Sequence, residues 1–219
     1  MEVQETIKEI KKQFRLYMNG VVSQSMREKG LNYKLNFGIE VPRIKEIATK
    51  FEKNHDVAQA LWKENIRECK ILAGLLQPVD TFYSEIADIW VEDMCYPEIA
   101  ELTVMNLFQY LPNASEKAYE WMAHEGEYFQ MCGFLIMARL LMKGCELNER
   151  AENEFVDQAM TALFDESGLV CKAASTALSK FALQKRMNAR KLWKLMQNLS
   201  SCDRLEVIAL KEEIKLAAE

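Results

Sequence analysis

Residues 127–143 place the tightest limit on what this chain can fold into, because they are apolar at almost every position. The apolar side chains are Phe129, Met131, Cys132, Phe134, Leu135, Ile136, Met137, Leu140, Leu141 and Met142. A surface helix has one apolar stripe, whereas a helix that is apolar all round must be covered on every side. The stretch ends at Gly144, and glycine suits the position that follows a helix. This segment predicts a helix buried within a larger assembly of helices.

The rest of the chain also has helical patterns. The 219 residues include only eight Gly and four Pro, and 49% of them are hydrophobic, which favours helices over many short strands. Short links of two to six residues separate the predicted elements, and no stretch predicts a strand. We predict helices at about 2–18, 20–29, 42–53, 56–63, 66–77, from 80 or 81 through 90, 97–111, 114–126, 127–143, 148–165, 168–184, 188–200 and 202–217.

Several residues predict where these helices begin or end. Gly30 suits the position just after the second helix. Asp56 and Asn148 are predicted N-caps, because their side chains can accept hydrogen bonds from the first free amides. Asn113 and Glu116 have the spacing of a capping box, in which each side chain bonds the other residue's backbone amide.

The predicted helices fall into pairs. The second helix of each pair starts near residue 42, 65, 97, 127, 168 or 202, so the spacing varies from the twenties to about forty. Such spacing is typical of degenerate helical-pair repeats, which stack into a curved superhelix with one concave face. No linker or low-complexity segment divides the chain. We therefore predict one all-α domain over residues 1–219.

The net charge is −5, but acids and bases are unevenly distributed. Between Glu85 and Glu166 there are seventeen acids and four bases. From Ser167 to Cys202 there is no acid, and seven bases occur: Lys172, Lys180, Lys185, Arg186, Arg190, Lys191 and Lys194. This basic segment could meet phosphates, since neutralising a phosphate releases its counterions. It could equally be the solvated face of two helices that balances the acidic middle.

The chain has no sequence motif of a common catalytic or metal site. The six cysteines form no CxxC pair, and the two histidines lie far apart, at 55 and 124. There is no Gly-rich phosphate loop, nucleophile elbow or HExxH sequence. We expect reduced thiols and no metal or cofactor. The N-terminus has no signal-peptide pattern and no apolar run reaches eighteen residues, which predicts a soluble, cytoplasmic protein without a membrane partner.

The residues from Leu35 to Ala48 read L-N-F-G-I-E-V-P-R-I-K-E-I-A. Gly38 suits a backbone turn that other residues resist, and Pro42 suits the first positions of a helix. The pattern F-G-I-x-x-P-x-I-K-x-I is followed by Leu61-Trp62 and then by Ile66-Arg67-Glu68-Cys69-Lys70. Together these letters resemble the DNA alkylation repair family, the HEAT-like-repeat alkylpurine DNA glycosylases of the AlkD type.

The resemblance implies a fold, a partner and a chemistry. It implies HEAT-like repeats in a right-handed curved α-α superhelix that holds double-stranded, alkylated DNA on a basic concave face. The implied reaction removes N3- or N7-alkylated purines and uses an aromatic residue, a carboxylate and an arginine. The carboxylate would stabilise the positive sugar that develops as the base departs, and no base-stacking pocket is required.

The residues that match the family's motifs depart from this chemistry. The aromatic residue is kept as Tyr96, but the carboxylate position falls on Ala100 and the arginine position on Met131. A further cleft tryptophan falls on Thr176. The remaining acids near Tyr96 are Glu98 and Glu101, and a shift of one residue turns a helical side chain by about 100°.

Three functions remain open at this stage. The first is a non-catalytic family member that binds DNA through Lys45, Lys70, Lys172 and Lys180. The second is an active glycosylase whose acid has moved to Glu98 or Glu101. The third is a scaffold whose apolar, acidic concave face holds a protein or peptide. The oligomeric state stays open.

Overall fold

The structure is a computed structural model that describes residues 3–197 and 204–219. These residues form α-helices, two short 3-10 helices and one isolated bridge between Leu35 and Ile66, without a β-strand. The all-α prediction is confirmed. The chain divides into two compact units, Met1–Leu111 and Pro112–Glu219, which are described one at a time below. The single domain over 1–219 and the curvature of the superhelix stay predictions.

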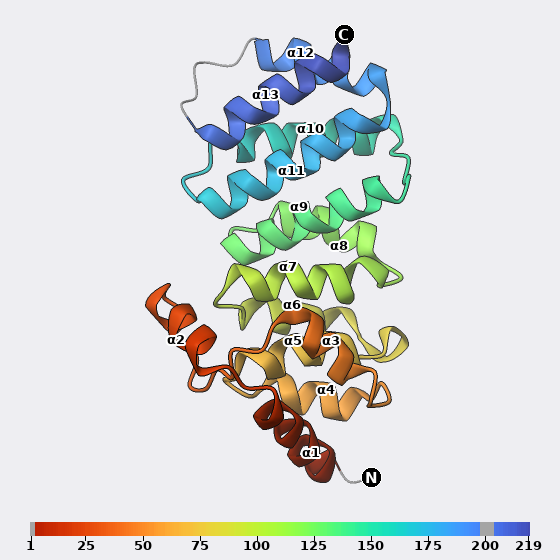
Figure 1. Cartoon of the computed structure of the whole chain (residues 1–219). Helices are drawn as coiled ribbons and strands as arrows, with labels where there is room; N and C mark the ends of the chain where they lie inside the picture. Colours follow the sequence, from red (N-terminus) through yellow and green to blue (C-terminus); the bar gives the residue numbers. More distant parts are fainter. Residues whose placement is uncertain (1–2, 198–203) are drawn as a thin grey trace. The chain divides into compact units, whose positions relative to one another are not determined.

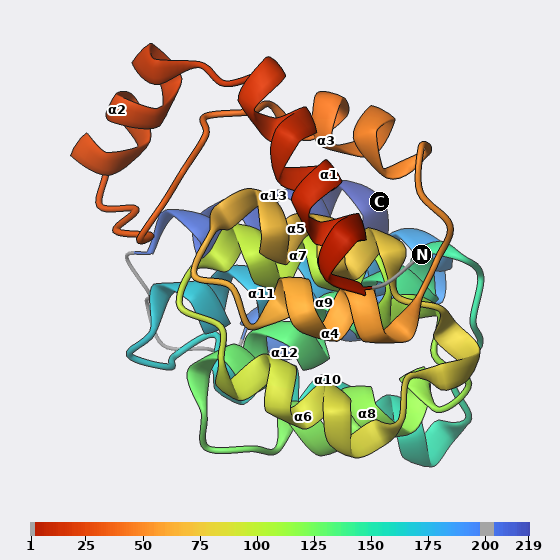
Figure 2. The same ribbon diagram turned by 90° about the horizontal axis from the view of Figure 1, so that it is seen from below.

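The first unit is organised around one buried helix. Its α-helices are α1 (Val3–Leu16), α2 (Gly20–Glu28), α3 (Val41–Ala48), α4 (His55–Trp62), α5 (Arg67–Leu76), α6 (Ser84–Glu92) and α7 (Pro97–Asn106), with 3-10 helices at Val79–Thr81 (η1) and Phe108–Tyr110 (η2). Helix α5 packs against α3, α4 and α7 and is buried at nine of its ten residues (Figure 1). Helix α2 has no buried residue and projects from the edge of the unit (Figure 2).

The second unit is built from longer helices. They are α8 (Ala114–Met122), α9 (Glu127–Met142), α10 (Glu149–Ala162), α11 (Gly168–Gln184), α12 (Arg186–Gln197) and α13 (Leu205–Ala218). Helix α9 packs against α8 and α11, and α11 also packs against α10, α12 and α13. Helix α8 approaches α9 so closely that a Cβ at Gly133 would lie 2.6 Å from the Met122 nitrogen. Most of α9 is buried, as its all-round apolar pattern predicts.

Several helix ends follow the predictions. Gly30 adopts a positive φ of 95°, and the Leu31 amide donates to the Met26 carbonyl at 3.1 Å, which closes α2. The Asn148 side chain accepts a hydrogen bond from the Ala151 amide at 2.9 Å. The predicted boundaries at 200 and 202 lie outside the described residues. Within the described ranges, no helix is both long and apolar enough to cross a bilayer.

Two boundaries around α3 and α4 differ from the predictions. Helix α3 ends at Ala48 and not near residue 53, because the amides of Lys50 and Phe51 bond carbonyls only three residues back. The N-cap of α4 is Asn54 and not Asp56: the Asn54 side chain accepts from the Val57 amide at 3.0 Å.

Three further boundaries were also predicted wrongly. Residues 79–81 form η1, so α6 begins only at Ser84, and Ile89 is 59% exposed and lies off the buried stripe. The helix predicted for 97–111 stops at Asn106, because Leu107 leaves helical geometry at φ −133°, ψ −65°. Asn113 makes no side-chain cap bond, since its ψ of 22° departs from the extended conformation of a capping residue.

Candidate functional site

Helix α5 carries three charged side chains into the interior of the first unit. Arg67 is 1% exposed, Glu68 is 0% exposed and Lys70 is 9% exposed. Removing a charge from water is costly unless partners compensate for the lost hydration. The partners of these three residues therefore show how this part of the fold is organised.

Glu68 and Arg67 hold the loop that contains the F-G-I sequence. The Glu68 carboxylate accepts hydrogen bonds from the backbone amides of Phe37 at 3.1 Å and Ile39 at 3.2 Å. Arg67 donates to the Ile39 carbonyl at 2.8 Å and to Glu68 at 3.3 Å. Gly38, between them, has φ 70°, and a Cβ there would lie 2.3 Å from the Asn19 carbonyl oxygen. The family-like letters at 37–39 and 67–68 thus have a structural role.

Arg67 also binds Glu98, one of the predicted site residues on α7. Its Nε and Nη2 donate to the two carboxylate oxygens of Glu98 at 2.8 and 2.6 Å. Burial lowers the pKa of Arg67, but the hydrogen bond and charge of Glu98 together with the Glu68 carboxylate outweigh it, so the pKa is raised. The Glu98 carboxylate is therefore already held by a bidentate pair with Arg67.

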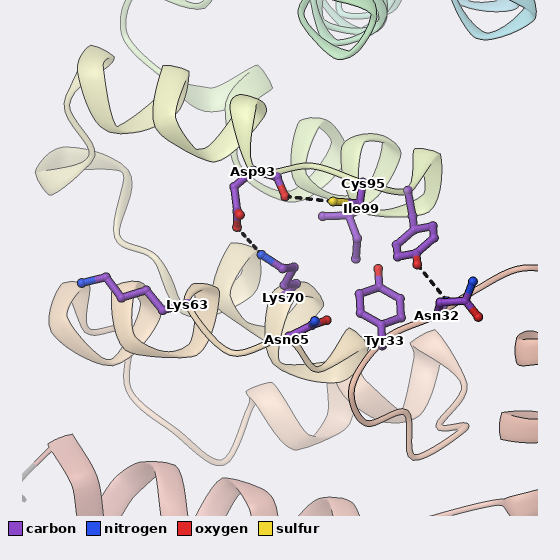
Figure 3. A pocket seen from close by; sticks show the side chains of 9 residues that line it. Asn32, Tyr33, Lys63, Asn65, Lys70, Asp93, Cys95 and Ile99 are labelled. Carbon is purple, nitrogen blue, oxygen red and sulfur yellow. Dashed lines mark hydrogen bonds and ion pairs between the residues drawn. The ribbon is translucent and has the colours of Figure 1, made fainter.

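A pocket of about 280 Å³ lies between the 32–33 segment, helix α5 and the start of α7 (Figure 3). We call it the tyrosine pocket, and its lining residues are Asn32, Tyr33, Lys63, Asn65, Lys70, Asp93, Cys95, Tyr96 and Ile99. On one wall the Lys70 ammonium pairs with the Asp93 carboxylate and donates to the Trp62 carbonyl at 3.0 Å. The same ammonium lies 4.5 Å from the centre of the Trp62 ring.

Two tyrosines form the opposite wall. The ring centroids of Tyr33 and Tyr96 are 4.5 Å apart, and the Asn32 amide donates to the Tyr96 hydroxyl at 2.8 Å. Tyr33 is only 6% exposed, and its hydroxyl has no hydrogen-bond partner among the described residues. Burial, followed by the negative charge of Glu98, raises the pKa of Tyr33, so this hydroxyl stays protonated and can donate.

The structure brings together only part of the predicted site. Tyr96 lines the pocket and Glu98 lies beside it, paired with Arg67. Ala100 is fully buried in the core, and the α7 residue that lines the pocket one turn after Tyr96 is Ile99. Glu101 is exposed. No carboxylate from α7 lines the pocket.

The other predicted positions lie in the second unit. Met131 on α9 is 3% exposed, and Thr176 on α11 is half-buried with its hydroxyl donating to the Lys172 carbonyl at 2.8 Å. Across the described residues, no group of three or more His, Cys, Asp or Glu side chains could hold a metal ion. The five described cysteines, 69, 95, 132, 145 and 171, are not joined in disulfides.

The four lysines predicted to bind DNA have different surroundings. Lys45 and Lys172 are exposed, Lys180 is half-buried, and Lys70 is buried in the ion pair with Asp93. Lys70 therefore belongs to the tyrosine pocket and not to an open basic surface.

Four of the seven bases in the basic segment have partners within the second unit. Lys185 pairs with Glu146 and Lys191 with Glu152, both at 2.6 Å. Arg186 and Arg190 donate to the Ala218 carbonyl at 3.4 and 3.2 Å. For Lys185 and Lys191, whose partners lie in the acidic middle of the sequence, the structure supports the charge-balancing interpretation. Lys172 and Lys180 are not part of these contacts.

Sequence reasoning counted Asp93 among the acids that could face a cleft, but it did not identify Tyr33, the pairing of Asp93 with Lys70, or the roles of Arg67 and Glu68. One signal was available in R-E-C-K, where three charges open a helix whose remaining positions are apolar. A helix with apolar residues on all its other faces has no side left to solvate those charges. Tyr33 had no such signal, since it lies in the non-helical connection between α2 and α3.

The sequence model described as "DNA alkylation repair enzyme" matches residues 6–194. The chain belongs to the DNA alkylation repair enzyme family. No curated protein matches the sequence. Within the family match lie both the loop at 37–39 and the tyrosine pocket.

Two solved structures are similar to this member of the family. One is described as "a new family of proteins related to the HEAT-like repeat DNA glycosylases with affinity for branched DNA structures". It is 14% identical, with a TM-score of 0.79, over 100% of this chain and 96% of that one. The other is a designed armadillo repeat protein, also 14% identical, with a TM-score of 0.40 over 90% of this chain and 100% of that one. The similarity to the first of these structures confirms the HEAT-like fold predicted from the sequence.

Proposed function

We propose that this family member binds DNA through exposed or half-buried basic side chains and does not cleave alkylated purines from it. The observation that carries the second half is the register of α7. Tyr96 and Ile99 line the tyrosine pocket, while Ala100 is turned into the core. A glycosylase of the implied type needs a carboxylate near the aromatic residue to stabilise positive charge on the sugar.

The acids that remain nearby are poorly suited to replace it. Glu98 is held by two hydrogen bonds from Arg67, and Asp93 is paired with Lys70. A carboxylate that is already paired with a cation gives weaker electrostatic stabilisation to the positive charge that develops on the sugar. Glu101 is exposed one position beyond Ala100, about 100° further round the helix.

DNA as the partner is supported by family membership and by the similar structure, which is described as having affinity for branched DNA. In the first unit, Lys45 is exposed on α3. On the same helix Arg43 lies 4.8 Å from the centre of the Tyr17 ring, and Lys50, after the helix, lies 5.6 Å from it. We assign DNA contacts to Lys45, Lys172 and Lys180. The cytoplasmic location predicted from the sequence is part of this proposal.

Binding is tested by fluorescence anisotropy with a labelled duplex and a labelled four-way junction over a range of salt concentrations. If basic side chains contact phosphates, log K falls linearly with log salt, by about 0.9 per neutralised phosphate on duplex DNA. We expect the triple variant K45Q/K172Q/K180Q to weaken binding and reduce this slope by about 2–3.

The matched control is K12Q/K185Q/K191Q, which changes the net charge equally. Each of these lysines is already paired with a carboxylate, from Glu9, Glu146 and Glu152 respectively. The control should keep most of the affinity. A flat salt response would contradict DNA binding, and equal losses in both triple variants would contradict the assigned lysines.

Catalysis is tested by incubating the protein with methylated duplex DNA and measuring free 3-methyladenine and 7-methylguanine. We expect no release above the rate without protein. Release that is lost in E98Q or E101Q would instead establish a glycosylase with a relocated acid. If neither form of DNA binds, the scaffold for a protein or peptide becomes the better explanation of this fold.

A further inference from the structure

The tyrosine pocket contains a buried hydrogen-bond donor that the protein itself does not use. The Tyr33 side chain lines the pocket, is 6% exposed, and has a hydroxyl without a partner among the described residues (Figure 3). Buried polar groups in folded proteins are nearly always hydrogen-bonded, and an unmatched one is destabilising. A ligand with an acceptor atom in this pocket would supply the missing partner.

The other polar groups of the pocket include both donors and acceptors. The Lys70 ammonium and the Asp93 carboxylate form one wall, and the Asp93 side chain is 54% exposed. The carboxamides of Asn32 and Asn65 are exposed at its edge. A phosphate offers only acceptors and would be repelled by Asp93. The edge of a nucleobase offers donors and acceptors side by side, which matches this set.

The size and the aromatic wall also fit a single base. The volume of about 280 Å³ lies just below the roughly 300 Å³ at which typical ligand pockets begin. This leaves room for one ring system but not for a folded peptide. The paired rings of Tyr33 and Tyr96 line the pocket, and proteins commonly hold unpaired bases against such rings. Lys63, exposed and also lining the pocket, can neutralise a phosphate of the same nucleotide.

We propose that the tyrosine pocket binds one unpaired nucleobase, with the Tyr33 hydroxyl and the Lys70–Asp93 pair recognising its polar edge. This inference rests on the proposed DNA binding for the source of the base. It goes beyond the chemistry implied by the family resemblance, which requires no base pocket. It also predicts that the protein binds DNA with an unpaired nucleotide more tightly than fully paired DNA.

The test uses the full chain and two duplexes, one with a single bulged 2-aminopurine and one fully paired. Affinity is followed by the anisotropy of a dye at the far end, and entry of the base by 2-aminopurine emission. We expect wild type to bind the bulged duplex about tenfold more tightly and to change its emission. In Tyr33→Phe, which loses only the hydroxyl, this preference should fall by about two- to tenfold, as for one neutral hydrogen bond.

Two controls separate the pocket from general effects. Tyr83→Phe removes a hydroxyl from a tyrosine of the same unit that is 68% exposed, and it should leave the preference unchanged. Asp93→Asn is the second pocket variant, since more than half of that side chain is exposed and the shape is kept. It should also lower the preference. Affinity for the paired duplex should be the same in wild type and Tyr33→Phe, with folding checked by circular dichroism.

The outcomes distinguish this inference from the proposed function. If both duplexes bind equally, emission does not change and Tyr33→Phe has no effect, the base pocket is wrong while DNA binding stands. If no DNA binds, the proposed function fails, and 2-aminopurine riboside then tests the pocket alone. Binding of the riboside to wild type but not to Tyr33→Phe supports the pocket, and no binding to either protein overturns it.

Discussion

Helices α5 and α9 are both largely buried within their units, but they differ in what they bury. Helix α9 buries mainly Phe, Met, Ile, Cys and Ala side chains. Helix α5 buries Arg67, Glu68 and Lys70 along with its apolar residues. An apolar helix only needs close packing, whereas a buried charge needs partners with fixed geometry. Each charge of α5 therefore organises a second segment: the loop at 37–39, the start of α7, or the tyrosine pocket.

The comparison explains where a candidate site arises in this fold. The pocket is next to the helix that carries buried charges, because those charges orient polar groups that packing alone would leave at the surface. In the second unit, the buried Lys117 pairs with Glu120, which lies three residues further along the same helix. The following predictions test how far this contrast between the units extends.

The largest effect is expected for Glu68→Gln. It removes the charge that faces Arg67 and changes the acceptor for two backbone amides, so we expect a loss of about 3–5 kcal/mol in the free energy of unfolding. Urea unfolding measures it. The control, Glu152→Gln in the second unit, breaks a partly exposed pair with Lys191 and should lower stability by about 0–1 kcal/mol. Similar losses in both variants would show that α5 does not depend on its buried charges.

The next largest effect is expected for Gly38→Ala. The new Cβ would lie 2.3 Å from the Asn19 carbonyl oxygen and 2.6 Å from the Ser23 nitrogen, at φ 70°. Left-handed backbone strain and overpacking together predict a loss of about 2–4 kcal/mol. Gly30→Ala has φ 95° but no atom within 4 Å of its Cβ, so it should lose only about 1–2 kcal/mol.

Gly133→Ala completes this series in the second unit. Its Cβ would lie 2.6 Å from the Met122 nitrogen and 2.8 Å from the Ala118 oxygen, in ordinary helical geometry. Overpacking alone predicts a loss of about 1–3 kcal/mol. Equal stabilities of the variants at 38 and 30 in urea unfolding would mean that the 37–39 loop can move away, and that Glu68 does not hold it.

A pH dependence is also expected, because α5 and α9 each bury a cysteine thiol. Burial raises the pKa of the Cys69 thiol to about 12. The charge of Lys11 lowers this pKa by a smaller amount, and the charges of Glu64 and Glu68 raise it. Burial also raises the pKa of Cys132. Because the folded state then holds protons that the unfolded state releases near pH 9, stability should fall as pH rises from about 9 to 12. The slope approaches about 1.4 kcal/mol per pH unit for each thiol.

Urea unfolding at pH 8, 9 and 10 measures this dependence, and thiol labelling at pH 8 gives an independent check. In a Cys202→Ser background, chosen because residue 202 lies outside the described residues, exposed Cys95 should react at least about a hundredfold faster than Cys69 or Cys132. Stability that is unchanged between pH 8 and 10, together with rapid labelling of Cys69, would show that α5 is more accessible than α9.

The sequence by itself determined the helices and the family. The all-round apolar pattern of 127–143 is enough to predict a buried helix, and Gly30 and Asn148 mark helix ends through local backbone chemistry. The residues at 37–39 and 67–68 carried the family resemblance, and buried hydrogen bonds join these two segments.

Only the tertiary structure decided which side chains form the site. Ala100 and Ile99 are adjacent in sequence, yet one is turned into the core and the other lines the pocket, a rotation of about 100° that motif alignment does not resolve. Tyr33 and Tyr96, or Arg67 and Glu98, meet across distant segments. Local sequence fixes backbone hydrogen bonds within a helix, whereas a pocket depends on where long-range packing brings several segments together.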